Sequence, residues 1–127
     1  MQYLVFLAQL VDVFHSLELW RVDPLLQGEL SLKLATLYEA RATLRSPHSL
    51  DGFDLLYDRA LLLECKTQLE RDVYCVEAAR EGVYGVEGAS LETLHSQFFL
   101  AQTRVNIKLA STIPPPCKCI PTHLVFC

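Results

Sequence analysis

The sequence predicts an all-α protein in which four antiparallel helices form either a bundle or two solenoid-type helical hairpins. Apolar residues recur at helical spacing in four segments between residues 1 and 113, which we take as one helical domain. Proline or glycine separates these segments, and no convincing strand pattern occurs among them. Three consecutive prolines from Pro114 to Pro116 favour extended backbone, so residues 114–127 are expected to form an extended tail.

The first helical segment, residues 2–21, is apolar around most of its circumference. Its polar residues Gln9, Asp12 and Ser16 recur at helical spacing and make only a narrow stripe. Such a helix is normally buried on several sides, and only three other helices are predicted within the chain. We therefore expect an apolar side of this helix to bind a partner. The residues expected to do so are Leu4, Leu7, Val11 and Phe14.

The second helix is predicted over residues 24–45. Asp23 suits the N-cap position, and Pro24 suits the first helical position, where the missing N–H leaves no bond unmade. The residue before Pro47 disfavours helical backbone, which ends the segment. Gly28 is expected to allow a close crossing with another helix. The expected buried stripe is Leu30, Leu34, Leu37 and Leu44.

The third and longest helix is predicted over residues 53–80, after an N-cap at Asp51 or Ser49. It carries two neighbouring apolar stripes. The first stripe contains Leu55, Leu62, Cys65, Leu69, Val73 and Val76. The second stripe contains Phe53, Leu56, Ala60 and Leu63. Two stripes indicate a helix that packs against neighbours on two sides.

A loop is predicted over residues 81–89, because glycines favour a helix stop and a turn. The glycines are Gly82, Gly85 and Gly88. Ser90 is then predicted to cap the fourth helix. The expected inner face of that helix is Leu91, Leu94, Phe98, Val105 and Leu109.

The tail carries soft metal ligands as well as apolar side chains. The possible ligands are Cys117, Cys119, His123 and Cys127. Zn²⁺ prefers thiolate and imidazole, so a small zinc-binding or thiol-redox protein is the alternative interpretation. The C-x-C spacing differs from the usual C-x2-C arrangement of zinc sites, and we therefore expect no cofactor and a tail that docks on a partner. The docking residues are expected to be Ile120, Leu124 and Phe126.

Composition limits the class of partner and the compartment. The net charge is −4 and the Lys and Arg residues are scattered, so the basic face of a nucleic-acid binder is missing. No apolar run reaches the ~20 residues that a membrane span needs. The five cysteines are an odd number without the regular spacing of a disulfide framework. These features favour a reducing compartment such as the cytoplasm, with a cytoskeletal or organellar assembly as a further possibility.

Motifs that carry enzyme chemistry are weak in this sequence. No nucleophile elbow or phosphate-binding loop is present. Glu92 and His95 form a single E-x-x-H, whereas a di-iron bundle needs two. The acids interpreted as a cap and as first-turn residues that offset the helix dipole are Asp51, Asp54 and Asp58. Cys65 and Cys75 are interpreted as core thiols. His15 and His48 are interpreted as histidines without a role. We therefore expect no enzyme.

Residues 53–65 resemble the latter half of a tetratricopeptide repeat, in which Tyr57, Ala60 and Leu61 would take packing positions on one helix. The resemblance implies an array of helical hairpins of scaffold type, whose stacked helices present a binding surface. We therefore expect a non-catalytic structural or interaction subunit of a larger assembly. Its partners are expected to be other protein subunits, in a hetero- or homo-oligomer.

Overall fold

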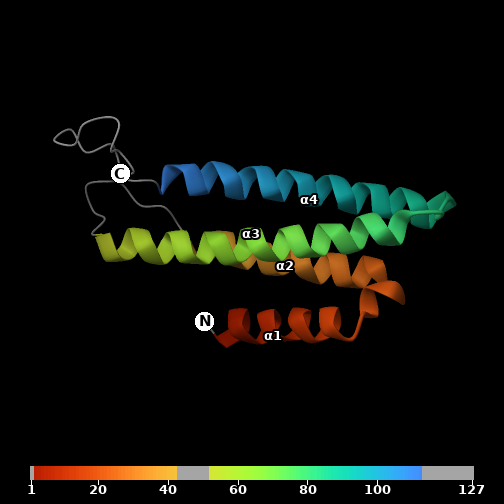
Figure 1. Cartoon of the computed structure of the whole chain (residues 1–127), viewed down its shortest axis with the longest axis horizontal. Helices are drawn as coiled ribbons and strands as arrows, with labels where there is room; N and C mark the ends of the chain where they lie inside the picture. The colour runs from red at the N-terminus through yellow and green to blue at the C-terminus, as the bar shows by residue number, and fades with distance from the viewer. Residues whose placement is uncertain (1, 43–51, 113–127) are drawn as a thin grey trace, which may run out of the picture.

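The computed structural model describes residues 2–42 and 52–112, and within them the chain is all-α, which confirms the predicted fold class. The helices are α1 (Gln2–Ser16), α2 (Pro24–Arg41), α3 (Gly52–Arg80) and α4 (Gly85–Ser111), and the short 3-10 helix η1 (Leu19–Arg21) follows α1. Successive helices run in opposite directions (Figure 1). The predicted tail, residues 114–127, lies outside the described residues.

Helices α2, α3 and α4 pack against one another and enclose the main core, while α1 packs mainly on α2 (Figure 1). Helices α2 and α4 are also in contact with each other. The buried residues of this core are Ala35, Ala42, Leu62, Cys65, Leu69, Val76, Leu91, Leu94, Phe98, Ala101, Val105 and Leu109. A methyl group at Gly28 would overlap the side chain of Leu94, so this glycine does allow the close crossing of α2 and α4.

The predicted stripes of α3 and α4 have different outcomes. The inner face of α4 is buried at every predicted position: Leu91, Leu94, Phe98, Val105 and Leu109. The first stripe of α3 is buried at Leu62, Cys65, Leu69 and Val76. The second stripe is wrong at Ala60 and Leu63, which are exposed. That side of α3 faces solvent, because α2 and α4 both pack on the other side.

Three of the four residues of α1 that were predicted to bind a partner pack on α2 instead. Leu4, Leu7 and Val11 are only 8%, 3% and 0% exposed, because they pack on Leu34 of α2 in a second, smaller core cluster. Phe14 is partly buried. The expectation that these residues present a surface to a partner therefore needs correction, since the chain itself covers them. Any partner of α1 must contact its other sides.

The ends of the first two helices follow local backbone chemistry. Helix α1 stops at Ser16 instead of continuing to residue 21, and Glu18 takes a left-handed conformation with φ of 56° before η1 begins. The predicted cap of α2 is confirmed, because Asp23 Oδ1 accepts a hydrogen bond of 3.1 Å from the amide of Leu26. Helix α2 ends at Arg41, and residues 43–51 lie outside the described residues.

Helix α4 begins at Gly85, so the prediction that it starts after Ser90 is wrong. Gly82 and Gly85 have positive φ of 74° and 76° and form the turn, as predicted. Gly88 instead lies inside the first turn of α4 and is buried. A Cβ atom there would approach the carbonyl oxygen of Val83 to 2.6 Å. The third glycine thus serves close packing of the loop on the helix, not the turn itself.

Replacing Gly88 with alanine is expected to destabilise the fold by about 1–3 kcal/mol, the usual range for overpacking. Alanine normally favours a helix over glycine by about 1 kcal/mol, but here the methyl group would meet backbone atoms that have little freedom to move. Chemical denaturation followed by circular dichroism measures the change. A Gly88→Ala protein more stable than the original chain would contradict the described packing. Ala89→Gly, at an exposed neighbouring position, should lose only the propensity difference.

Candidate functional site

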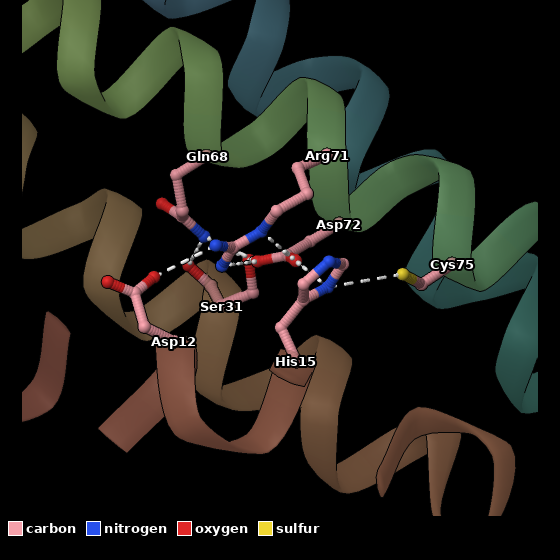
Figure 2. A network of polar contacts seen from close by, with 7 residues as sticks. All are labelled: Asp12, His15, Ser31, Gln68, Arg71, Asp72 and Cys75. Atoms are coloured by element: carbon pink, nitrogen blue, oxygen red, sulfur yellow. Dashed lines mark hydrogen bonds and ion pairs between the residues drawn. The ribbon is translucent and has the colours of Figure 1, made fainter. Parts of the chain in front are cut away.

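A network of polar side chains lies between α1, α2 and α3, with Asp72 at its centre (Figure 2). Asp72 falls on the apolar stripe of α3, between Leu69 and Val76, so the helix directs it inward. Ser31 on α2 and His15 on α1 approach it from the other two helices. The side chain of Asp72 has 0% exposure. A wholly buried carboxylate is therefore shared by three helices.

Hydrogen bonds from two neutral side chains hold this carboxylate. Ser31 Oγ donates to Asp72 Oδ2 over 2.5 Å, and Gln68 Nε2 donates to the same oxygen over 3.1 Å. The Gln68 amide also donates to the carbonyl oxygen of Ser31 over 3.0 Å and contacts its hydroxyl group. Burying a charge is costly unless the charge is paired and hydrogen-bonded. These donors therefore fix the carboxylate in one orientation and offset much of that cost.

Arg71 supplies the opposite charge. Its Nε donates to Asp72 Oδ1 over 3.0 Å, and its Nη1 donates to Asp12 Oδ1 over 2.8 Å, so it ties α3 to α1. Burial by itself lowers the pKa of Arg71, but the hydrogen bonds and charges of Asp72 and Asp12 outweigh this effect and raise the pKa above its ordinary value. The guanidinium group therefore stays charged at every pH at which the chain is folded.

His15 turns one ring nitrogen toward two groups on α3. Its Nδ1 lies 3.7 Å from Cys75 Sγ and 3.7 Å from Asp72 Oδ1 (Figure 2). His15 and Cys75 border an open groove of about 600 Å³. The groove is lined by His15, Glu18, Trp20, Glu70, Arg71, Tyr74 and Cys75. The structure thus places His15, which we predicted to have no role, in contact with a thiol and a carboxylate.

This arrangement does not suit nucleophilic catalysis by the cysteine. In a Cys–His–acid triad the base takes the thiol proton on one nitrogen while the acid holds the other nitrogen. Here Cys75 and Asp72 both face Nδ1 of His15. Burial, and then the charge of Asp72, raises the pKa of Cys75. The thiol is therefore protonated near neutral pH and a poor nucleophile.

Cys65 is a core residue, as predicted. It is fully buried in the main core, and its Sγ lies 3.7 Å from the carbonyl oxygen of Ala35. Burial, followed by the charge of Glu39, raises the pKa of the Cys65 thiol to about 12. This cysteine is therefore unreactive in the folded chain.

The E-x-x-H pair on α4 does not converge on one point. Glu92 Oε2 accepts a hydrogen bond of 3.0 Å from Arg80 Nη1, whereas His95 Nε2 lies 3.2 Å from Glu77 Oε1. Both contacts join α3 to α4 at the surface, and each residue has its own partner. The two side chains therefore act as separate links between helices, which agrees with the absence of a second E-x-x-H in the sequence.

Asp58 was expected to be a first-turn acid of the third helix, and this is wrong. Because α3 begins at Gly52, Asp58 lies in the second turn, where it is only 1% exposed. Its Oδ2 has no hydrogen-bond partner among the described residues. Asp51 and the side chain of Asp54 lie outside the described part of the chain.

A further buried acid, Glu39, joins α2 to α4. It is 8% exposed, and its carboxylate accepts hydrogen bonds of 3.1 and 3.2 Å from Arg104 and one of 3.3 Å from Lys108. Hydrogen bonding to Glu39 outweighs burial and raises the pKa of Arg104. The two cations come from one face of α4, at i and i+4, so this cluster fixes the position of α4 on α2.

Sequence reasoning missed the Asp72 network, although one signal was available. Asp58 and Asp72 interrupt the apolar stripe of α3 at helical spacing, and a charged residue on an otherwise buried face is usually paired. The identity of the partners had no such signal, because they come from other helices. The tail residues expected to bind a partner or a metal lie outside the described residues, so these expectations stay predictions. They are Cys117, Cys119, Ile120, His123, Leu124, Phe126 and Cys127.

An exposed apolar stripe runs along α1 on a side that the chain does not cover. We call it the outer stripe, and it consists of Tyr3, Phe6, Val13 and Leu17, which are 55%, 62%, 51% and 65% exposed. At 3.6 residues per turn these positions share one side of the helix, roughly a third of a turn from the buried side. The sequence contains no charged residue from position 2 to position 11. The four residues of the outer stripe are all apolar and uncharged.

None of the described helices combines the length and the apolarity needed to cross a lipid bilayer. No family model, curated protein or solved structure matches the chain. The likeness of residues 53–65 to a tetratricopeptide repeat therefore stays a prediction. Two features of the geometry bear on the function of the chain: the outer stripe of α1 and the polar network around Asp72.

Proposed function

We propose that this chain is a non-catalytic interaction subunit and that it associates with protein partners through the outer stripe of α1. The observation that carries this proposal is the exposure of four apolar side chains, each more than half exposed, on a single side of one helix. Contiguous apolar patches on soluble proteins commonly mark sites of association. The outer stripe replaces the residues predicted from the sequence, which the chain itself buries.

A second copy of this chain is the occupant that fits the outer stripe best. A two-fold axis brings the same patch of both copies together, so a charged patch would place like charges face to face. The outer stripe has no charge. Two acids adjoin it in the sequence, and each has a cation within the chain: Asp12 pairs with Arg71 on α3, and Glu18 pairs with Arg21. Pairing of α1 with α1 therefore removes apolar surface from water without electrostatic repulsion.

The proposed association is expected to be modest in strength. A stable interface typically buries about 800 Å² on each partner, which is more than four side chains of one helix supply. We therefore expect dimers that dissociate on dilution, and an assembly in which this contact acts together with others.

Replacing Phe6 with glutamate is expected to abolish self-association, because two charged residues would then meet in an apolar contact. Sedimentation velocity of the full chain over a series of concentrations measures the effect. The original chain should shift from monomer to dimer as concentration rises, and Phe6→Glu should remain a monomer with unchanged helix content. Val86→Glu is the matched control, because Val86 is an apolar residue of 87% exposure at the start of α4.

Two outcomes would contradict this proposal. An original chain that stays monomeric throughout the series would show that the outer stripe does not bind a second copy. Equal loss of association in the Phe6→Glu and Val86→Glu proteins would show that association is not located on α1.

A further inference from the structure

Three side chains of different chemistry converge on one point between α1 and α3. They offer an imidazole nitrogen, a carboxylate oxygen and a thiol sulfur, from His15, Asp72 and Cys75, and these ligand atoms lie within 4.8 Å of one another. Two of the separations are 3.7 Å, from His15 Nδ1 to Cys75 Sγ and to Asp72 Oδ1. In a tetrahedral zinc site, bond lengths of about 2.0–2.3 Å place neighbouring ligand atoms roughly 3.3–3.6 Å apart.

We propose that His15, Asp72 and Cys75 form a zinc-binding site that joins α1 to α3. The ligand set combines the nitrogen, oxygen and sulfur donors that Zn²⁺ accepts. The two separations of 3.7 Å exceed the expected one by a few tenths of an ångström, and the third, between Cys75 and Asp72, lies within 4.8 Å, so side-chain movements of about 1 Å or less close the site. This site goes beyond the proposed interaction function and is separate from the outer stripe.

The helices place these ligands without strain. Asp72 and Cys75 are three residues apart on α3, a spacing that puts both side chains on one face. His15 comes from the last turn of α1 and reaches the same point from the opposite side (Figure 2). Ser31 and Gln68 already orient the Asp72 carboxylate by hydrogen bonds, which is the support that zinc ligands usually have.

The charges of the proposed ligands offset the charge of a divalent cation. A thiolate at Cys75 and a carboxylate at Asp72 together offset the two positive charges of Zn²⁺, while neutral His15 contributes a lone pair. Arg71 contacts Asp72 but is itself paired with Asp12 over 2.8 Å. Binding requires that the thiol release its proton to solvent, as zinc-bound cysteines do.

The fourth coordination position opens on the groove beside α3. His15 and Cys75 line that groove, so a water molecule from it can complete the tetrahedron. The site would fasten α1 to α3, a pair of helices that otherwise meet through few contacts, since α1 packs mainly on α2. Zinc would therefore stabilise the position of α1.

Cobalt titration tests this proposal, because Co²⁺ occupies zinc sites and a thiolate ligand gives a charge-transfer band in the near ultraviolet. The protein is the full reduced chain in which the tail ligands are removed by Cys117→Ser, Cys119→Ser, His123→Gln and Cys127→Ser. We expect this protein to bind one equivalent of Co²⁺ with a thiolate band, and we expect Zn²⁺ to displace the cobalt and raise the midpoint of thermal unfolding.

Two further variants of the tail-substituted protein locate the ligands. Losing even a hydrogen-bonded partner of a metal ligand costs about 10–100-fold in affinity, so Cys75→Ser and His15→Gln should each weaken cobalt binding at least tenfold. Cys75→Ser should also remove the thiolate band. Cys65→Ser and His95→Gln are matched controls with a thiol and an imidazole elsewhere in the fold, and they should bind cobalt unchanged. Circular dichroism verifies that each variant is folded.

The opposite results would overturn the proposal. If the tail-substituted protein binds no cobalt, the tail is the metal site or there is none. If binding persists at full strength in both Cys75→Ser and His15→Gln, the ligands are not those between α1 and α3.

Discussion

Replacing Leu69 with alanine is expected to lower the free energy of unfolding by about 2–5 kcal/mol, and replacing Leu62 should have a similar effect. Both side chains are 0% exposed and belong to the core that α2, α3 and α4 enclose. Truncation removes favourable burial and leaves a cavity that the surrounding helices fill only in part. The loss would be a large share of the stability of a domain that is typically stable by about 5–15 kcal/mol.

Leu63→Ala is the matched control for this experiment. Leu63 is the same residue type on the same helix, but it is 43% exposed, so its loss should stay near the ~0.5 kcal/mol of surface substitutions. Chemical denaturation measures all three proteins at one concentration, because association would otherwise shift the apparent stability. Equal losses at Leu63 and Leu69 would show that α3 is rotated from the described orientation.

The inner face of α4 could be predicted from the sequence because its buried residues recur at one helical phase. The first stripe of α3 was predicted in the same way, but the second stripe was wrong at Ala60 and Leu63, because the sequence does not show which apolar side a neighbouring helix covers. Helix α1 has no single apolar phase. Apolar residues surround most of it, and the buried side is chosen by contact with Leu34 of α2, which no pattern within α1 can reveal.

The start of α4 was predicted six residues late for a similar reason. Ser90 is a good N-cap residue by type, and Gly88 a good loop residue, but both preferences are weak compared with tertiary packing. Gly88 is needed where the first turn of α4 approaches the carbonyl group of Val83. A glycine suits both a flexible loop and a close backbone contact, so its presence in the sequence does not show which of the two it serves.

The candidate site was beyond sequence reasoning for a different reason. Its side chains come from α1, α2 and α3, and the sequence does not state which helices become neighbours. Asp72 on an apolar stripe indicates that a buried partner exists. That the partners are Ser31, Gln68 and Arg71, with His15 beside them, follows only from the packing of the bundle.

Replacing Asp72 with alanine is expected to destabilise the fold by about 3 kcal/mol, an effect as large as that of a core truncation. The carboxylate accepts hydrogen bonds from Ser31, Gln68 and Arg71 in a place without exposure to solvent. Its removal leaves the Ser31 hydroxyl without its acceptor, and it leaves the Arg71 guanidinium with Asp12 as its remaining acidic partner. Denaturation in the presence of a chelator measures this effect, so that bound metal does not contribute.

Asp12→Ala is the control that separates burial from charge pairing. Asp12 contacts the same guanidinium at 2.8 Å, but its side chain is 67% exposed, and exposed ion pairs contribute only about 0–1 kcal/mol. A double-mutant cycle with Ser31→Ala then tests the hydrogen bond directly. Because residues within one network are not additive, Ser31→Ala should cost less in the Asp72→Ala background than in the original chain. Additive losses, or equal losses for Asp12→Ala and Asp72→Ala, would mean that the buried network does not hold α1, α2 and α3 together.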